Sequence, residues 1–192
     1  EKPSPKSIVR AMSAARNERA ALIATLRDAG PDAPTLCEGW TTKDLVAHMV
    51  VREHRPDAAP GILVPALADY TAKVQNRVAA ETDWDELLAK LAAGPPLYSP
   101  LKLLDPVANM HEMFVHHEDV RRAVPGWQPR ELDPAAVAAL RRPLPMFVRL
   151  GMAKMPGRVS LRTPDGKTLA SAGRGPAVTI TGEVPELLMF AF

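Results

Sequence analysis

The stretch WTTKDLVAHMVVREHRP, residues 40–56, carries both a start signal and a stop signal for a helix. With Thr41 as the N-cap, Asp44 takes the third helical position, and the two residues form a variant of the capping box. Trp40 and Leu45 then occupy the positions of a hydrophobic staple, and the closing proline ends the helix. The second turn of this helix contains His48 among apolar neighbours, so we predict that the imidazole points inward.

The first two-thirds of the chain has helical periodicity throughout. Capping residues, prolines and glycines divide it into further helices, and the pair Asp83 and Glu86 predicts a second capping box. The predicted helices lie between Ser4-Pro5 and Gly30-Pro31, after Pro60-Gly61, from Asp83 to Gly94-Pro95, from Asp105-Pro106 to Pro125-Gly126, and from Asp133-Pro134 onward, where Pro143 and Pro145 divide the last one.

After Gly157 the apolar pattern changes to a period of two. The segments VSLRT, TLASA and AVTIT are predicted strands, and GEVPELLMFAF is the predicted start of a helix. The fold class is therefore mostly α: a helical bundle over residues 1–150, followed by a partial α+β domain over residues 151–192. The chain stops at Phe192 within an apolar run, so we expect this last element to continue beyond it.

Composition limits the classes of partner. The chain has 192 residues and a formal net charge of +2, and no basic stripe with interleaved aromatic residues is present, so we expect no nucleic-acid partner. No apolar run approaches the roughly 20 residues of a membrane span, so we expect no membrane partner. The single cysteine, Cys37, excludes an internal disulfide and fits a reducing cytoplasm.

The stretch HEMFVHHEDVRR, residues 111–122, contains three of the five histidines. On a helix, Glu112 and His116 share a face and could chelate one ion, and His48 is the best candidate for a third ligand. Two imidazoles and one carboxylate suit Zn²⁺ or another divalent first-row metal with open coordination positions. The alternative is a hydrogen-bonded core histidine and an E-x-x-x-H spacing that arose by chance.

The neighbouring polar residues have simpler interpretations. His54 and His111 are predicted at the surface, and Cys37 is interpreted as a structural thiol, because no general base or second cysteine stands beside it. A solvated helix face with local ion pairs is predicted for the remaining polar residues of the stretch: His117, Glu118, Asp119, Arg121 and Arg122.

Two blocks resemble a known family. TLCEGWTTKDLVAHMVVREHRPDAAPGI, residues 35–62, and NMHEMFVHHEDVRRA, residues 109–123, are similar to the signatures of the mycothiol-dependent maleylpyruvate isomerase family, in an actinobacterial branch. That family belongs to the DinB-like group of metal-binding four-helix bundles. The resemblance implies a metal, zinc most often, on His48, Glu112 and His116, and mycothiol as a thiol cofactor. Residues 159–192 resemble the start of the family's sterol-carrier-like C-terminal domain, but an arginine that the isomerase draws from that domain has no match here.

Three functions remain open at this point. The first is a transferase or isomerase in which the metal activates mycothiol, with a small-molecule thiol and an electrophilic substrate as partners. The second is a hydrolase in which the metal activates water. The third is a non-catalytic module that binds a metal or a lipid. Whether the protein forms a homodimer is also left open.

Overall fold

The computed structural model describes residues 5–62, 64–102, 106–151 and 156–192. It is mostly α-helical with a small C-terminal sheet, which confirms the predicted fold class. Ser4 and Asp105, two of the expected helix-start residues, lie outside the described ranges. The helices are α1 (Pro5–Ala29), α2 (Thr42–His54), α3 (Ala68–Glu81), α4 (Trp84–Ala93), α5 (Pro106–Arg122), α6 (Pro134–Arg141), α7 (Leu144–Gly151) and α8 (Val184–Ala191), with 3₁₀ turns η1 (Ala59–Ile62), η2 (Pro65–Leu67) and η3 (Pro100–Lys102).

The chain forms two compact units. The first consists of Glu1–Arg16, Pro106–Val115 and Arg130–Phe192, and the second of Asn17–Asp105 and His116–Pro129. Both units therefore contain discontinuous stretches of sequence, and α5 contributes its beginning to the first and its end to the second. The domain boundary expected near residue 150 stays a prediction.

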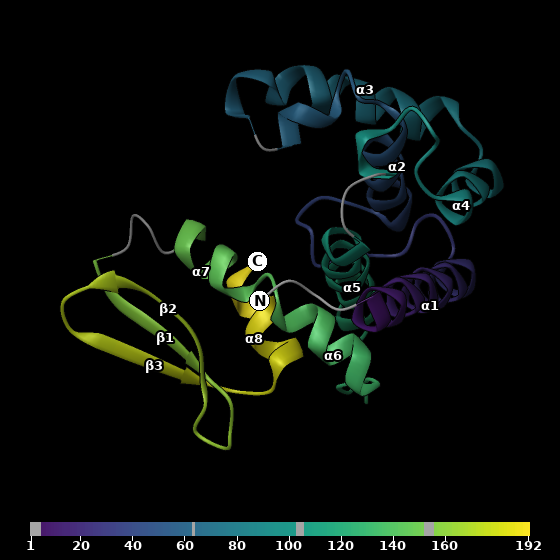
Figure 1. Cartoon of the computed structure of the whole chain (residues 1–192). Helices are drawn as coiled ribbons and strands as arrows, with labels where there is room; N and C mark the ends of the chain where they lie inside the picture. The colour runs from purple at the N-terminus through teal and green to yellow at the C-terminus, as the bar shows by residue number, and fades with distance from the viewer. Residues whose placement is uncertain (1–4, 63, 103–105, 152–155) are drawn as a thin grey trace. The chain divides into compact units, whose positions relative to one another are not determined.

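In the second unit, α2 packs against α3 and α4 (Figure 1). The capping box that starts α2 is confirmed. The Asp44 backbone N–H donates to the Thr41 hydroxyl over 3.3 Å, and the Thr41 backbone N–H donates to the Asp44 carboxylate over 2.9 Å. These two bonds satisfy backbone donors that the first turn would otherwise leave unpaired. The helix that carries His48 therefore starts where the sequence predicts.

The second predicted capping box is wrong. Asp83 is the N-cap of α4, but its side chain makes no capping hydrogen bond. Glu86, which would complete the box, instead pairs with Lys90 one turn later, with 2.8 Å between the carboxylate and the ammonium nitrogen. The Glu86 carboxylate can either pair with a lysine four residues later or accept a hydrogen bond from the N-cap backbone N–H, and the two interactions compete. Here the ion pair uses it.

The sheet of the first unit has the strand order β2-β1-β3, from β1 (Gly157–Arg162), β2 (Thr168–Arg174) and β3 (Ala177–Thr181). β1 pairs with β2 antiparallel and with β3 parallel, so the chain crosses the start of β1 between Arg174 and Ala177. This crossing needs Gly173, which has φ +92°. A Cβ atom there would lie 2.0 Å from the Gly157 carbonyl oxygen. Helix α7 lies against β2, and α8 packs against α6 and α7 (Figure 1).

The break between α6 and α7 is where the prolines predict it. α6 ends at Arg141 and α7 begins at Leu144, because Pro143 and Pro145 lack the N–H that a continuous helix needs. Both helices contribute to the apolar core of the first unit, which also takes residues from α5, the sheet and α8. The fully buried members include Met110, Leu140, Leu144, Val148, Leu161 and Leu188. Within the described ranges, the helices are all too short or too polar to cross a membrane.

Candidate metal centre

Helix α5, which carries the histidine-rich stretch, is buried on all sides. From Met110 to Val120 every residue is buried except Glu112, which is half-buried. His117 is 2% exposed, Glu118 1% and Asp119 8%. The prediction of a solvated face for these residues is therefore wrong. Arg121 and Arg122, at the end of the helix, are half-buried.

A polar helix can lie inside the protein when each buried group has a partner. The two nitrogens of His117 contact Glu18 and Thr25 of α1, each over 2.8 Å. The Glu118 carboxylate accepts hydrogen bonds from Arg121 and Arg122, also over 2.8 Å each. These contacts explain why the polar residues of α5 are buried: their hydrogen bonds are made with other side chains instead of with water.

The three residues predicted as ligands lie together. One ligand atom from each of His48, Glu112 and His116 is within 4.8 Å of the other two. Glu112 and His116 are one turn apart on the same helix, α5, and His48 comes from α2. The imidazole rings of His48 and His116 are 5.4 Å apart between centroids and nearly perpendicular. His48 and Glu112 are half-buried, and His116 is 6% exposed.

Both imidazoles are oriented by oxygen acceptors. His48 donates from Nδ1 to the Gln75 side-chain oxygen over 3.1 Å, and His116 donates from Nδ1 to the Asp119 carboxylate over 3.0 Å. A neutral imidazole that is protonated at Nδ1 carries its lone pair on Nε2. The Trp40 ring lies 5.1 Å from that of His48 and limits its rotation. Both rings are therefore held with the lone pair on Nε2, and metal-bound histidines usually have a hydrogen-bond acceptor of this kind on their other ring nitrogen.

Cys37 lies beside this group. Its thiol donates to the Asp119 carboxylate over 3.4 Å, and one ligand atom each from Cys37, His116 and Asp119 lies within 4.8 Å of the others. The loop that carries the cysteine is held by a backbone hydrogen bond from Leu36 N–H to the Asp119 carbonyl, 3.0 Å long. The thiol therefore supports the carboxylate that orients His116.

The two histidines predicted at the surface are less exposed than expected. His111 is 7% exposed, which contradicts the prediction, because its ring packs against Phe147 and Phe192 with centroids 4.9 and 5.9 Å away. His54, at the end of α2, is half-buried. Its Nε2 atom is buried, and no hydrogen-bond partner for it is found among the described residues. Neither histidine belongs to the two ligand groups above.

Sequence reasoning missed the residues that orient the imidazoles. Asp119 stands three positions after His116, which places both on one helix face, so its role could have been found from spacing. Gln75 is 27 residues from His48 and belongs to another helix. Nothing in a single sequence connects these two residues, since their contact depends on how α3 packs against α2.

The fold and this group of side chains define a helical protein with a candidate centre for a divalent metal. Comparison with known families makes the assignment more specific. Residues 12–96 match the model of the mycothiol maleylpyruvate isomerase N-terminal domain. The resemblance in the sequence is thereby confirmed over the matched residues.

A solved structure has the same fold along almost the whole chain. It is the crystal structure of a histidine-to-alanine variant of the mycothiol-dependent maleylpyruvate isomerase, with a TM-score of 0.56 and 13% identity. The match covers 99% of this chain and 89% of that one. At this identity the likeness establishes the fold alone. A search of curated proteins found no match.

Proposed function

We propose that the protein binds one divalent metal ion through His48, Glu112 and His116, and that it is a mycothiol-dependent transferase or isomerase. The observation that carries the proposal is the convergence of these three side chains within 4.8 Å. The family match over residues 12–96 supports mycothiol as the thiol, because the matched domain is described by that cofactor.

The donor set fits such an ion. Two imidazole nitrogens and one carboxylate oxygen are usual ligands of Zn²⁺, and a set of three leaves a position for a further ligand. Hydrogen bonds to Gln75 and Asp119 hold the two imidazole rings so that the Nε2 atom of each ring would bind the ion. Zn²⁺ is our preferred ion, although other divalent first-row metals accept the same donors.

When bound, the ion would supply Lewis acidity, which lowers the pKa of a coordinated thiol or water. The protein residues set the charge of the site. His48 and His116 are neutral as ligands, so Glu112 is the only anion in the set, and a net positive charge of about one remains to favour a thiolate over a neutral thiol. The Trp40 ring lies 5.1 Å from that of His48 between centroids and provides an apolar surface next to the ligands.

The electrophilic substrate would reach the centre past His48 and Glu112, which are half-buried, whereas His116 is 6% exposed. The related crystal structure is of an enzyme named for maleylpyruvate, and we propose a substrate of the same general kind, a small electrophile that a thiolate can attack. The proposed reaction class is thiol-dependent isomerisation or transfer.

Metal content tests the ligand set. The purified protein should contain about one divalent ion per chain, and His48→Ala and His116→Ala should each lose it. His54→Ala is the matched control, because His54 is on the same helix as His48 but belongs to neither ligand group. Elemental analysis with undiminished metal in both His48→Ala and His116→Ala would reject the assignment.

Cobalt substitution tests thiol activation. Adding mycothiol to the Co²⁺ protein should produce a sulfur-to-cobalt charge-transfer band and release a proton, because a cationic centre binds thiolate better than thiol. Glu112→Gln should weaken metal retention and leave the helical circular dichroism unchanged. A filled centre with no band, no proton release and no thiol-dependent turnover of electrophiles would favour a water-activating hydrolase or a non-catalytic metal-binding module.

A further inference from the structure

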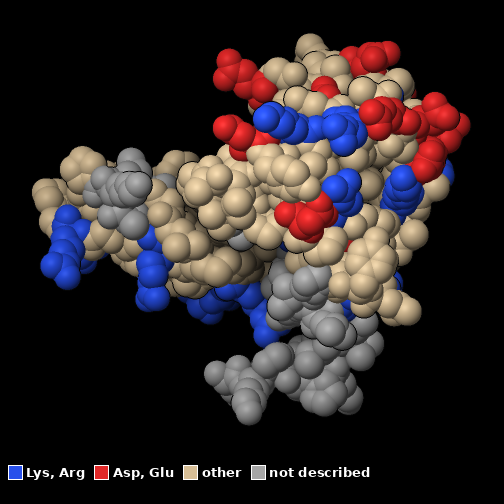
Figure 2. Space-filling model, turned by 90° about the horizontal axis from the view of Figure 1, so that it is seen from above, with Lys and Arg blue, Asp and Glu red and all other residues tan. Residues whose placement is uncertain are grey.

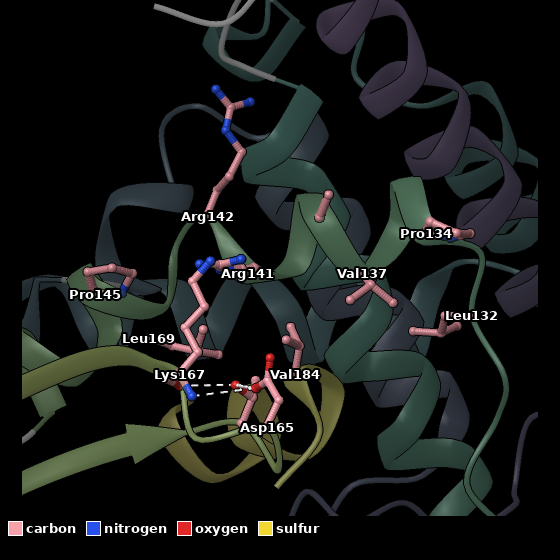
Figure 3. Close-up of a pocket in the computed structure, with 12 residues that line it drawn as sticks. Leu132, Pro134, Val137, Arg141, Arg142, Pro145, Asp165, Lys167, Leu169 and Val184 are labelled. Atoms are coloured by element: carbon pink, nitrogen blue, oxygen red, sulfur yellow. Dashed lines mark hydrogen bonds between the residues drawn. The ribbon is translucent and has the colours of Figure 1, made fainter. Parts of the chain in front are cut away.

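The first unit contains an open pocket of about 840 Å³ beside the sheet. One wall is apolar, and its side chains come from three separate elements: Val137 on α6, Leu169 on β2 and Val184 at the start of α8 (Figure 3). The volume lies within the range of small-molecule sites. None of the residues that line the pocket belongs to the candidate metal centre.

The rim of this pocket is cationic. Arg141, Arg142 and Lys167 line it, and all three are exposed. In Figure 3 the Lys167 side chain extends from the turn between β1 and β2 towards the end of α6, where Arg141 lies, and Arg142 points away from both. Among the described residues, no hydrogen bond or ion pair engages the side-chain nitrogens of these three cations. Arg141 and Lys167 are thus available to an incoming anion.

The one acid on the rim, Asp165, offsets only part of this positive charge. Asp165 accepts hydrogen bonds from the Thr163 hydroxyl and from the Lys167 backbone N–H, so its carboxylate is used within its own turn. The Thr163 hydrogen bond also lowers the pKa of Asp165, so the carboxyl stays ionised. Three cations therefore stand against one carboxylate, and the rim keeps a net positive charge.

The sequence around the pocket also contains more basic than acidic residues. Between Pro134 and Thr181 the chain has eight basic residues and one acidic residue, Asp165, although the whole protein has a net charge of only +2. Figure 2 shows one face of the molecule, and at the left of this view the coloured side chains are Lys and Arg only. Such a local excess attracts anions and raises their rate of association.

We propose that this pocket binds a small organic anion, a carboxylate with a short apolar body. The carboxylate would lie between Arg141 and Lys167, and the body would pack on Val137, Leu169 and Val184. The carboxylate matches the cationic rim of the pocket, and the apolar body matches its apolar wall. A nucleic acid is a poorer fit, because the residues that line the pocket include no aromatic side chain for base stacking.

The experiment compares three probes on the full chain by isothermal titration calorimetry. 4-Phenylbutyrate carries both halves of the proposed ligand, 4-phenyl-1-butanol only the apolar body, and inorganic phosphate only the charge. We expect 4-phenylbutyrate to bind at least tenfold more tightly than either of the others. Amide chemical shifts in two-dimensional NMR should change at Val137, Leu169 and Val184 when it binds.

Variants then assign the charge contacts. Arg141→Met and Lys167→Met should each weaken 4-phenylbutyrate binding at least tenfold and leave alcohol binding unchanged. Arg149→Gln is the matched control, because Arg149 is an exposed arginine on α7 outside the pocket, and it should bind normally. Equal affinity for acid and alcohol, tighter binding of phosphate, or unchanged binding by both Met variants would overturn the proposal. All three substituted positions are exposed, and thermal melts check that each variant is folded.

Discussion

Gln75 shows how much of the candidate centre depends on a single neutral side chain. Its oxygen accepts the Nδ1 proton of His48, and this contact selects the tautomer in which Nε2 can bind a metal. The glutamine itself is 7% exposed, so water cannot readily replace it as the acceptor. One hydrogen bond between α2 and α3 therefore helps to orient His48, together with the Trp40 ring.

Replacing this acceptor should weaken metal binding. We expect Gln75→Leu to reduce the affinity for Zn²⁺ by about 10- to 100-fold, the usual effect of removing a partner of a metal-bound histidine. Gln75→Glu keeps an oxygen at the same position and should retain most of the affinity. Competition with a fluorescent chelator measures both. Equal affinities for the Leu variant and the unchanged protein would show that Gln75 does not orient His48.

At this scale the sequence predicted the grouping of the candidate ligands better than their surroundings. His48, Glu112 and His116 were selected from helical spacing and from the resemblance, and the structure places their ligand atoms close together. The burial of His117 and Glu118 could not be predicted, because their partners lie elsewhere on α1 or one turn away, and a polar pattern looks the same whether water or side chains satisfy it.

At the scale of secondary-structure elements, a buried ion pair joins α1 to α2. Arg19 donates to the Glu53 carboxylate, with one contact of 2.9 Å, and to the Leu91 carbonyl over 2.6 Å. The Glu53 side chain has no exposed surface. Removing the arginine would leave a buried charge without its partner.

Arg19→Met should therefore lower the free energy of unfolding by about 3–5 kcal/mol, the usual cost of breaking a buried pair from one side. The double variant Arg19→Met/Glu53→Leu should recover most of this loss, because it replaces both charges with apolar groups. Urea unfolding measures the single and double variants. A loss below about 1 kcal/mol for Arg19→Met would mean that water reaches Glu53.

The crossing from β2 to β3 gives a prediction about strand geometry. Gly173 and Gly166 both have positive φ, +92° and +87°, but only Gly173 has a backbone atom where a Cβ would stand. Gly166→Ala should cost about 1–2 kcal/mol for its backbone conformation alone. Gly173→Ala should cost about 1–3 kcal/mol more, because the added atom overlaps the Gly157 carbonyl. Similar melting temperatures for the two variants would show that β1 moves aside easily.

Local signals predicted the elements well, and tertiary contacts explain the exceptions. The start of α2, the break at Pro143 and the three strands follow from caps, prolines and a period of two, all of which act within a few residues. The strand order β2-β1-β3 and the missing capping bond of Asp83 depend on which partner a group finds, and one sequence does not contain that information.

For the whole molecule, a bound metal should raise thermal stability. An ion that binds only the folded state at one hundred times its dissociation constant adds about 2.7 kcal/mol. In a protein of this size that corresponds to a melting temperature about 5–10 °C higher. Differential scanning calorimetry with and without Zn²⁺ measures the shift, and His116→Ala should show none. An equal shift in this variant would place the ion elsewhere.

The hydrogen bonds of His48 to Gln75 and of His116 to Asp119 have a consequence for how the protein would acquire its ion. Because other side chains of the protein already orient both imidazole rings, metal binding does not have to be coupled to folding, as it is in domains that fold around zinc. A chelator should then empty the protein without denaturing it, and a second ion should enter the same ligands afterwards. Which metal the protein carries in a cell would in that case follow supply, since the donor set accepts several divalent ions.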